Sequence, residues 1–433
     1  MKNKIVNDMT LSNELYASMS FAYRLDKEIE FSYVNYSFIS DALIDILNSK
    51  NIKINFEYKN LNNLKKNNNY FSTYKDETVT IYNKENSIIE NVSITKKGNS
   101  HSVYNSGVIG NNSALLSIEN IVLKNGTIKT FGVGAKGFYQ KNKNKKSTME
   151  NFIIETMQKN SNAVEVCEGS NIKLYNVYIY TNDNCSGGLC VSANSEINAN
   201  KTTVYTTGEL SPGLYLNGVF TLNKSLIETS YSYVAVLEGN SKLISIESSL
   251  RGYKGIKVLN NISSKEIKSN IGIIGRYLNV EKGWAFNCEN SNVDINLLNT
   301  NIVSKDKKLI ILKNNNGDKN FSHLVLKNSS VCGEINSDGK NILNISVNDR
   351  SYISGITKGN VNIKFCGKIY SYFSMTGDSY FKKIELMGNN IEELIKHFYL
   401  NGFTLYYDPI ENLWLNGKVY YFEDGSIVKP TER

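Results

Sequence analysis

The chain contains 433 residues, of which 41% are hydrophobic, so it can bury a large core and does not have the composition of a disordered protein. Its formal net charge of +8 comes almost wholly from lysine, because arginine occurs at only five positions. Proteins that read nucleic-acid sequences rely on arginine forks for base edges and phosphates, so the composition argues against a nucleic-acid partner.

No segment approaches the roughly 18 consecutive apolar residues of a membrane-spanning helix, so we expect no membrane insertion. The first thirty residues contain no continuous apolar segment, and no ordinary signal peptide is visible. Residues 1–80 also lack the repeat that follows them. Within this region SDALIDILNSK has the pattern of a short amphipathic helix, which Ser40 or Asp41 can cap. We interpret 1–80 as an N-terminal capping region.

Residues 81–385 repeat a six-residue frame: apolar, any, Asn, any, any, apolar. In KLYNVYIYT (173–181), Asn176 stands between Leu174 and Ile179. Asparagine is depleted in strands and tolerates positive φ, so the frame predicts two strands joined by one left-handed corner residue. Stacked corner amides are expected to bond from coil to coil as a structural ladder. The asparagines in this ladder are Asn91, Asn125, Asn151, Asn176, Asn299 and Asn328.

Other residues fill the same corner position elsewhere. The further matches to the frame have Lys201, Lys224, Gly275, Asp349 and Gly367 at the corner. From Asn125 onward the corners recur about every 25 residues, a period typical of solenoids. Helical segments are missing between the corners, and a propeller blade needs roughly 40 residues, so three short strands per period predict an all-β parallel β-helix of about a dozen coils.

Alternation along the strands after the corners assigns directions to the side chains. The inward positions form a threonine column, whose hydroxyls are expected to bond to one another between coils: Thr130, Thr156, Thr181, Thr206 and Thr229. The outward positions are Lys129, Glu155, Tyr180, Tyr205 and Glu228. Tyr180 and Tyr205 are therefore expected to stack on the surface and are the candidate binding residues, through sugar stacking.

Residues 386–433 have the pattern of a C-terminal cap. Asn390 can cap a helix over IEELIKHFYL that Gly402 closes. The tail that follows is predicted to form antiparallel hairpins with turns at DPIEN, NG and DG. A sugar-binding role for its aromatic residues is the alternative to capping.

Three segments together resemble a widespread family of adhesin-like, right-handed parallel β-helix proteins of microbial cell surfaces, with the pectin lyase-like fold. They are GELSPGLYLNGVFTLNKSLIETSYSYVAVLEGNSKL, YSYFSMTGDSYFKKIEL and GFTLYYDPIENLWLNGKVYY. The likeness covers roughly residues 75–431. It implies a right-handed coil and a cell-surface or extracellular location, whereas the missing export signal favours a cytoplasmic location or release by lysis.

Catalysis requires residues that the sequence does not place together. Glycosidase motifs of the pectin lyase-like enzymes resemble NTD, DD, GHG and RIK, and only Thr181, Asn182 and Asp183 faintly echo one of them. The six cysteines form no CxxC pair, although Cys185 and Cys190 could close a small loop under oxidising conditions. We therefore predict no catalytic residue, no metal and no cofactor.

The favoured function is a non-catalytic rod that contacts polysaccharide or surface proteins, or that self-associates. A polysaccharide lyase or hydrolase is the alternative, and Arg251 and Arg276, about one coil apart on one face, are the best indication of a substrate cleft. A spore-coat or phage-associated structural component is the third possibility.

Overall fold

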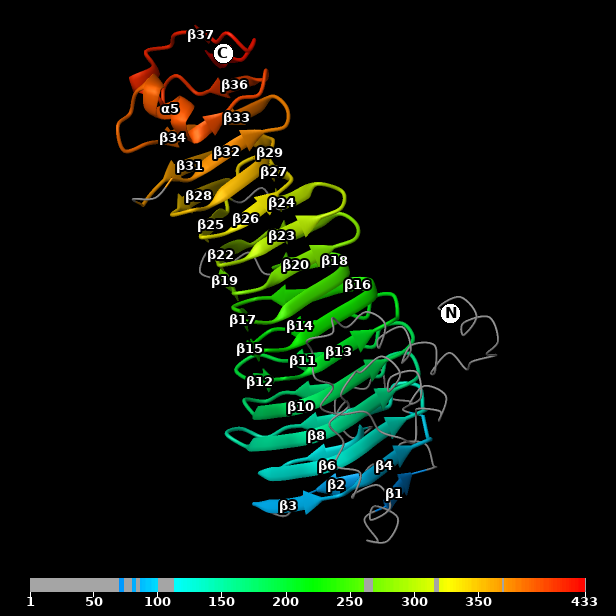
Figure 1. Ribbon diagram of the computed structural model, residues 1–433. Helices are drawn as coiled ribbons and strands as arrows, with labels where there is room; N and C mark the ends of the chain where they lie inside the picture. Colours follow the sequence, from blue (N-terminus) through cyan, green and yellow to red (C-terminus); the bar gives the residue numbers. More distant parts are fainter. Residues whose placement is uncertain are drawn as a thin grey trace, which may run out of the picture.

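The computed structural model describes residues 70–73, 80–82, 86–99, 113–260, 268–314, 319–367 and 370–432, with side chains from residue 86 onward. These residues form a right-handed parallel β-helix of about 13 turns, which confirms the predicted fold (Figure 1). The helix expected at SDALIDILNSK lies outside the described residues. Each turn contributes strands to three parallel sheets, which we call A, B and C.

Sheet A precedes the corner in each turn. It consists of β3 (Ser87–Glu90), the first halves of β6 (Ile121–Thr130), β8 (Lys146–Thr156) and β10 (Asn171–Thr181), then β12 (Glu196–Asn200), β15 (Val219–Asn223), β17 (Lys242–Ile246), β19 (Lys268–Ile274), β22 (Asn292–Leu298), β25 (Phe321–Lys327), β28 (Ile342–Asn348), β31 (Val361–Phe365) and β34 (Lys383–Glu385).

Sheet B follows the corner. It consists of β1 (Tyr70–Thr73), β4 (Ser93–Lys96), the second halves of β6, β8 and β10, then β13 (Thr203–Thr206), the first halves of β16 (Leu226–Glu238) and β18 (Ser249–Leu259), and β20 (Tyr277–Val280), β23 (Asn301–Ser304), β26 (Ser330–Cys332), β29 (Tyr352–Gly355), β32 (Tyr372–Met375) and β35 (Phe398–Tyr399).

Sheet C closes each turn. It consists of β2 (Thr80–Tyr82), β5 (Ser113–Ser117), β7 (Lys136–Gln140), β9 (Val164–Val166), β11 (Leu189–Val191), β14 (Leu214–Leu216), the second halves of β16 and β18, β21 (Trp284–Glu289), β24 (Lys308–Lys313), β27 (Glu334–Ser337) and β30 (Thr357–Gly359).

The core is a set of apolar columns that run along the rod. Ile179 lies in register with Ile154 on one side and Val204 on the other, and all three side chains are 0% exposed. Because each turn places like residues above like, the sheets enclose one continuous apolar interior. Burying each such side chain contributes about 1.5–3 kcal/mol relative to leaving it in water.

The asparagine corners have the backbone conformation that the frame requires. Asn91, Asn125, Asn151, Asn176, Asn299 and Asn328 all have φ between 49° and 56°. The Asn151 Nδ2 donates to Asn125 Oδ1 at 3.0 Å, and Asn176 Nδ2 donates to Asn151 Oδ1 at 2.7 Å. Asn328 Nδ2 donates to Asn299 Oδ1 at 2.6 Å. Two separate stretches of corner amides therefore connect successive turns.

Charged residues and glycine occupy the corner between these stretches. Lys201, Lys224 and Glu247 have φ of 50°, 47° and 46°, and Gly275 has φ of 86°. Glu247 escaped the sequence frame because an inward serine, Ser245, replaces the apolar residue before it. In lysine and glutamate the Cβ crowds the backbone in this conformation, so the corners at Lys201, Lys224 and Glu247 carry local strain, whereas glycine at position 275 does not.

One corner was assigned wrongly. Arg350, with φ of 53°, occupies the corner for which Asp349 was predicted. The backbone N–H of a corner residue donates to the carbonyl of the residue just before the next corner, and the N–H of Asn328 donates to Asp349 O, so the next corner is Arg350. This turn contains one extra residue, so Ile353 pairs with Val331 and Tyr352 points outward. Tyr370, assigned to an apolar position after Gly367, is also 46% exposed, and Phe373 fills the interior position instead.

The threonine column is inward, but its hydroxyl bonding differs from the prediction. Thr130, Thr156, Thr181, Thr206 and Thr229 are all buried. Their hydroxyls do not bond to one another: the Thr181 hydroxyl donates to Ser186 O at 2.8 Å, and the Thr206 hydroxyl donates to Ser211 O at 2.7 Å. Both bonds stay within one turn, since each acceptor lies only five residues further along the chain.

A hydroxyl ladder between turns does exist, one residue after the corner. The Thr202 amide donates to Ser225 Oγ at 3.0 Å, and the Ser225 amide donates to Ser248 Oγ at 2.9 Å. The same bonds recur at Thr300, Ser329 and Ser351. These hydroxyls satisfy buried amides at the corners, where regular strand pairing is interrupted.

The C-terminal region is mostly parallel, which corrects the prediction of antiparallel hairpins. A small sheet contains β33 (Ser379–Phe381), β36 (Thr404–Tyr407) and β38 (Ile427–Pro430) in parallel pairs, and only β37 (Tyr420–Tyr421) pairs antiparallel with β38 around the DG turn. The 3-10 turn η2 (Leu413–Leu415) lies between β36 and β37.

The helix α5 (Ile391–His397) is capped as predicted, because Asn390 Oδ1 accepts from the Glu393 amide at 2.8 Å. It is shorter than expected, since Phe398 and Tyr399 leave it to form β35, the last strand of sheet B. Gly402 therefore does not close the helix.

Candidate functional site

The two predicted binding tyrosines do not lie on an accessible surface. Tyr180 and Tyr205 stack with ring centroids 5.9 Å apart and planes inclined by 18°. Their exposed fractions are only 5% and 4%, and they pack in a cluster with Met157. The expected stacking is present, but sugar stacking on these rings requires an exposed face that they lack.

The other residues that the sequence singled out, a motif-like segment at 181–183 and the cysteines, form no functional site of their own among the residues that the structure describes. Thr181 is the buried last residue of β10. The Thr207 hydroxyl donates to Asn182 Oδ1 at 2.9 Å, and Asp183 Oδ1 accepts from the Asn184 amide at 2.7 Å, so Asn182 and Asp183 serve as loop residues. All six cysteines are free, including Cys185 and Cys190. Within the described part of the chain, no group of three His, Cys, Asp or Glu side chains could hold a metal ion.

A groove of about 990 Å³ lies on sheet B, over β20, β23, β26 and β29. Its wall on the corner side contains Gly275, followed by Asn299 and Asn328, which form the second stretch of corner asparagines. Its floor presents the outward residues Asn279, Asn301 and Val303, all of which are exposed. Because rungs are about 4.8 Å apart, four rungs make a groove about 14 Å long that follows the rod axis.

Two arginines line this groove. Arg276 follows the Gly275 corner and Arg350 occupies a corner itself, and both side chains are exposed. Neither forms an ion pair with any residue that the structure describes. Among the described residues that line the groove, the single carboxylate is Glu281, which is ion-paired with Lys305. The groove therefore carries net positive charge.

Arg251 lies beside the groove, one turn before it. Its Nε donates to the Tyr277 hydroxyl at 2.9 Å, and its guanidinium is 5.2 Å from the centroid of the same ring. Arg251 and Arg276 thus lie on adjacent turns of one face, as the sequence indicated. Arg251 fixes the orientation of Tyr277, whereas Arg276 is available to a ligand.

Exposed tyrosines continue the groove toward the C-terminal end. Tyr352 and Tyr372 stack with centroids 5.5 Å apart and planes inclined by 10°. Tyr399 meets Tyr372 edge-on at 4.9 Å, and the Tyr370 hydroxyl donates to the Tyr399 hydroxyl at 3.1 Å. Tyr352, Tyr370 and Tyr399 are 43%, 46% and 45% exposed. We call these four residues the tyrosine platform.

Sequence reasoning missed the platform because of the extra residue before Tyr352. The frame placed Tyr352 and Tyr370 at apolar positions, and the structure places both outside. A usable signal was present: Ile353 and Phe373 are better core residues, and taking them as inward puts Tyr352 and Tyr372 in one outward column.

Comparisons with known protein families, with curated proteins and with solved structures found no match. The geometry of the fold is thus the basis for any functional argument. Within the residues described, no helix is both long enough and apolar enough to cross a membrane.

Proposed function

We propose that this protein is a non-catalytic, adhesin-like β-helix rod that binds an anionic polysaccharide along sheet B. The observation that carries the proposal is the pair of exposed guanidinium groups, Arg276 and Arg350, on the walls of a long groove that has no free carboxylate among its described lining residues. The tyrosine platform lies in line with the groove and extends the contact surface to β35.

The chemistry of the groove suits a polymer with acidic sugars. Guanidinium groups form charge-assisted, bidentate bonds with carboxylate or sulfate groups. The amides of Asn279 and Asn301 offer donors and acceptors to hydroxyls, and aromatic faces pack against the apolar faces of sugar rings. Groove and platform together cover six rungs, or about 24 Å along the rod. An extended chain parallel to the rod axis can contact all of them.

The residues of the groove favour binding over hydrolysis. A glycosidase needs two carboxyl groups about 5–9.5 Å apart, and the groove offers only Glu281, which Lys305 already holds in an ion pair. A lyase that uses arginine as its base is the second candidate, because Arg276 is free to approach a substrate. Incubation with each polysaccharide, followed by assays for unsaturated and reducing ends, separates that activity from binding.

The test compares charged and uncharged polymers. Affinity electrophoresis through gels containing polygalacturonate, alginate or dextran is expected to retard the protein in the two anionic gels and not in dextran. The double variant Arg276→Ala/Arg350→Asn is expected to weaken binding at least tenfold, because each charge-assisted bond contributes about 1.5–3 kcal/mol. Asparagine at position 350 retains a residue suited to the corner.

A matched control removes two positive charges from another face. Lys173 in β10 and Lys242 in β17 are exposed on sheet A, so Lys173→Ala/Lys242→Ala changes the net charge equally. We expect this variant to bind like the unchanged protein. Equal loss in both double variants would show that net charge alone attracts the polymer, and the groove would then lose its role.

A further inference from the structure

A second cavity, of about 400 Å³, lies on sheet C at a different level of the rod. Its floor is one outward column of three successive turns, because Cys190 in β11 pairs with Glu165 in β9 and with Tyr215 in β14. Its rim includes Leu210 and Pro212 from the loop that leads into β14. We call this cavity the sheet C pocket. Its volume falls in the range that small-molecule sites occupy.

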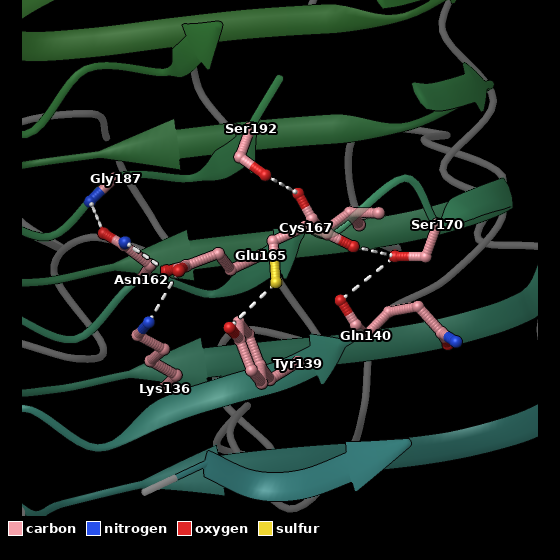
Figure 2. A network of polar contacts seen from close by, with 10 residues as sticks. Lys136, Tyr139, Gln140, Asn162, Glu165, Cys167, Ser170, Gly187 and Ser192 are labelled. Atoms are coloured by element: carbon pink, nitrogen blue, oxygen red, sulfur yellow. Dashed lines mark hydrogen bonds and ion pairs between the residues drawn. The ribbon is translucent and has the colours of Figure 1, made fainter. Parts of the chain in front are cut away.

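The carboxylate of Glu165 is held in a fixed orientation. Lys136 Nζ lies 2.6 Å from Glu165 Oε1, and Asn162 Nδ2 donates to Glu165 Oε2 at 2.9 Å. The Gly187 amide in turn donates to Asn162 Oδ1 at 2.8 Å. Figure 2 shows Lys136, from β7, and Asn162, from the segment just before β9, converging on the carboxylate, with Gly187 next to Asn162. Lys136 also lies over the ring of Tyr139, with its Nζ 4.7 Å from the centroid.

The opposite wall has a second carboxylate, that of Glu238. Burial, together with the interaction with Glu238, raises the pKa of Tyr215, so the phenol stays protonated. Glu238 directly follows Leu237, the register partner of Leu216, and Asn217, which also lines the cavity, directly follows Leu216. Burial likewise raises the pKa of the Cys190 thiol, which makes the centre of the floor uncharged and unreactive.

The two carboxylates are too far apart to act as a catalytic pair. Glu165 and the rung of Glu238 are separated by three turns, which is about 14 Å. Glycosidases place their carboxyl groups about 5–9.5 Å apart. The arrangement suits recognition of hydroxyl groups at two ends of a ligand.

We propose that the sheet C pocket is a second ligand site, which binds an uncharged saccharide unit of one or two rings. A carboxylate has about four acceptor positions, and Glu165 uses two of them inside the protein, so both glutamates retain acceptors for sugar hydroxyls. Tyr215 and the exposed side chain of Leu210 provide apolar contact for the ring. The two carboxylates repel an anionic ligand. Because Lys136 already neutralises Glu165, the ligand does not need to carry a positive charge either.

This site is independent of the groove on sheet B and has the opposite electrostatic character. The described lining of the sheet C pocket contains two glutamates and no lysine or arginine, whereas that of the groove contains two unpaired arginines. The rod is therefore built to hold two different carbohydrates, an acidic polymer on one face and a neutral unit on another.

In the experiment, the full chain is titrated with cellobiose, maltose, lactose and diacetylchitobiose, and calorimetry measures the binding. Cys185 on the rim provides a second readout, because it is exposed and its alkylation by N-ethylmaleimide can be followed by peptide mass spectrometry. At least one disaccharide is expected to bind and to slow alkylation of Cys185 at least threefold. The anionic galacturonate dimer is expected to do neither.

Two variants test the assignment. Tyr215→Phe/Asn217→Ala is expected to weaken disaccharide binding at least tenfold. Leu210→Gly removes the rim contact at a residue with φ of 53°, where glycine is unstrained, so it is expected to weaken binding without loss of stability. Arg276→Ala is expected to leave disaccharide binding unchanged. The proposal is overturned if none of the four disaccharides binds or protects Cys185, or if binding persists in Leu210→Gly and in the double variant.

Discussion

Sheet B presents outward side chains along the whole rod, but its N-terminal half buries them and its C-terminal half exposes them. In the first half, Glu155, Tyr180, Tyr205 and Glu228 are between 4% and 7% exposed. In the second half, the same column contains the exposed residues Asn279 and Val303, and the adjacent outward column contains Asn301 and Tyr352, which are also exposed. The difference teaches that strand alternation fixes the direction of a side chain and not its access to solvent.

The largest expected effect is loss of stability in the buried half. Tyr180→Ala and Tyr205→Ala are each expected to lower the free energy of unfolding by about 3–5 kcal/mol, because each removes a buried aromatic ring. Chemical denaturation measures this change. Tyr231→Ala is the control, since Tyr231 is 59% exposed and its loss is expected to cost less than about 0.5 kcal/mol. Similar losses at Tyr180 and Tyr231 would show that burial of the ring does not decide the cost of its removal.

Removing one hydroxyl of the ladder is expected to lower the free energy of unfolding equally in both halves of the rod, because the interior is alike in both. Ser225→Ala and Ser329→Ala each leave a buried corner amide without its acceptor, and each is expected to cost about 1–3 kcal/mol. Denaturation curves of the two variants give the comparison. A large difference between them would show that the halves differ inside as well as outside.

Tyr352→Ala should separate function from stability. Because the ring is 43% exposed, we expect a loss of stability below about 1 kcal/mol and a three- to tenfold weaker binding of anionic polysaccharide. The matched variant is Tyr175→Ala on sheet A, with the same exposed fraction of 43%. If both variants bind equally well, the platform takes no part in binding.

The smallest effect concerns the corners. Lys224→Asn replaces a lysine with φ of 47° by the residue preferred there, and is expected to raise stability by about 0.5–1 kcal/mol. The ion pair between Lys224 and Glu247, 3.6 Å apart and more than half exposed, contributes little against this gain. Thermal unfolding measures the change, and Asn151→Lys, which makes the reverse exchange within the asparagine stretch, should lower stability.

The repeat was readable from sequence because its physical cause is local. A left-handed corner restricts residue type at one position, and the core restricts the positions two before and three after it, so Asn125, Asn151 and Asn176 could be aligned without a structure. The frame failed where one residue was inserted before Tyr352, since one residue exchanges inside for outside. It also failed at Glu247, where a serine occupies the interior.

The candidate sites were less predictable because they depend on several turns at once. The groove needs Arg276 and Arg350, 74 positions apart, on the same wall, and only the turn lengths between them decide that. Tyr180 and Tyr205 pack in a cluster with Met157 from the neighbouring turn, and the alternation along one strand does not reveal such packing. The sheet C pocket gave no sequence signal, since Glu165, Cys190 and Tyr215 belong to no common motif.

If a polymer occupies the groove, the stacking of the turns sets the effect that it would have on the rod. Each strand of sheet B is hydrogen-bonded only to the strands of the adjacent turns, so local opening spreads between neighbours. A polymer lying over β20, β23, β26 and β29 bridges four turns that otherwise open separately. Slower amide hydrogen exchange in the corners at Asn299 and Asn328, beneath the polymer, would then report its residence on the outer face.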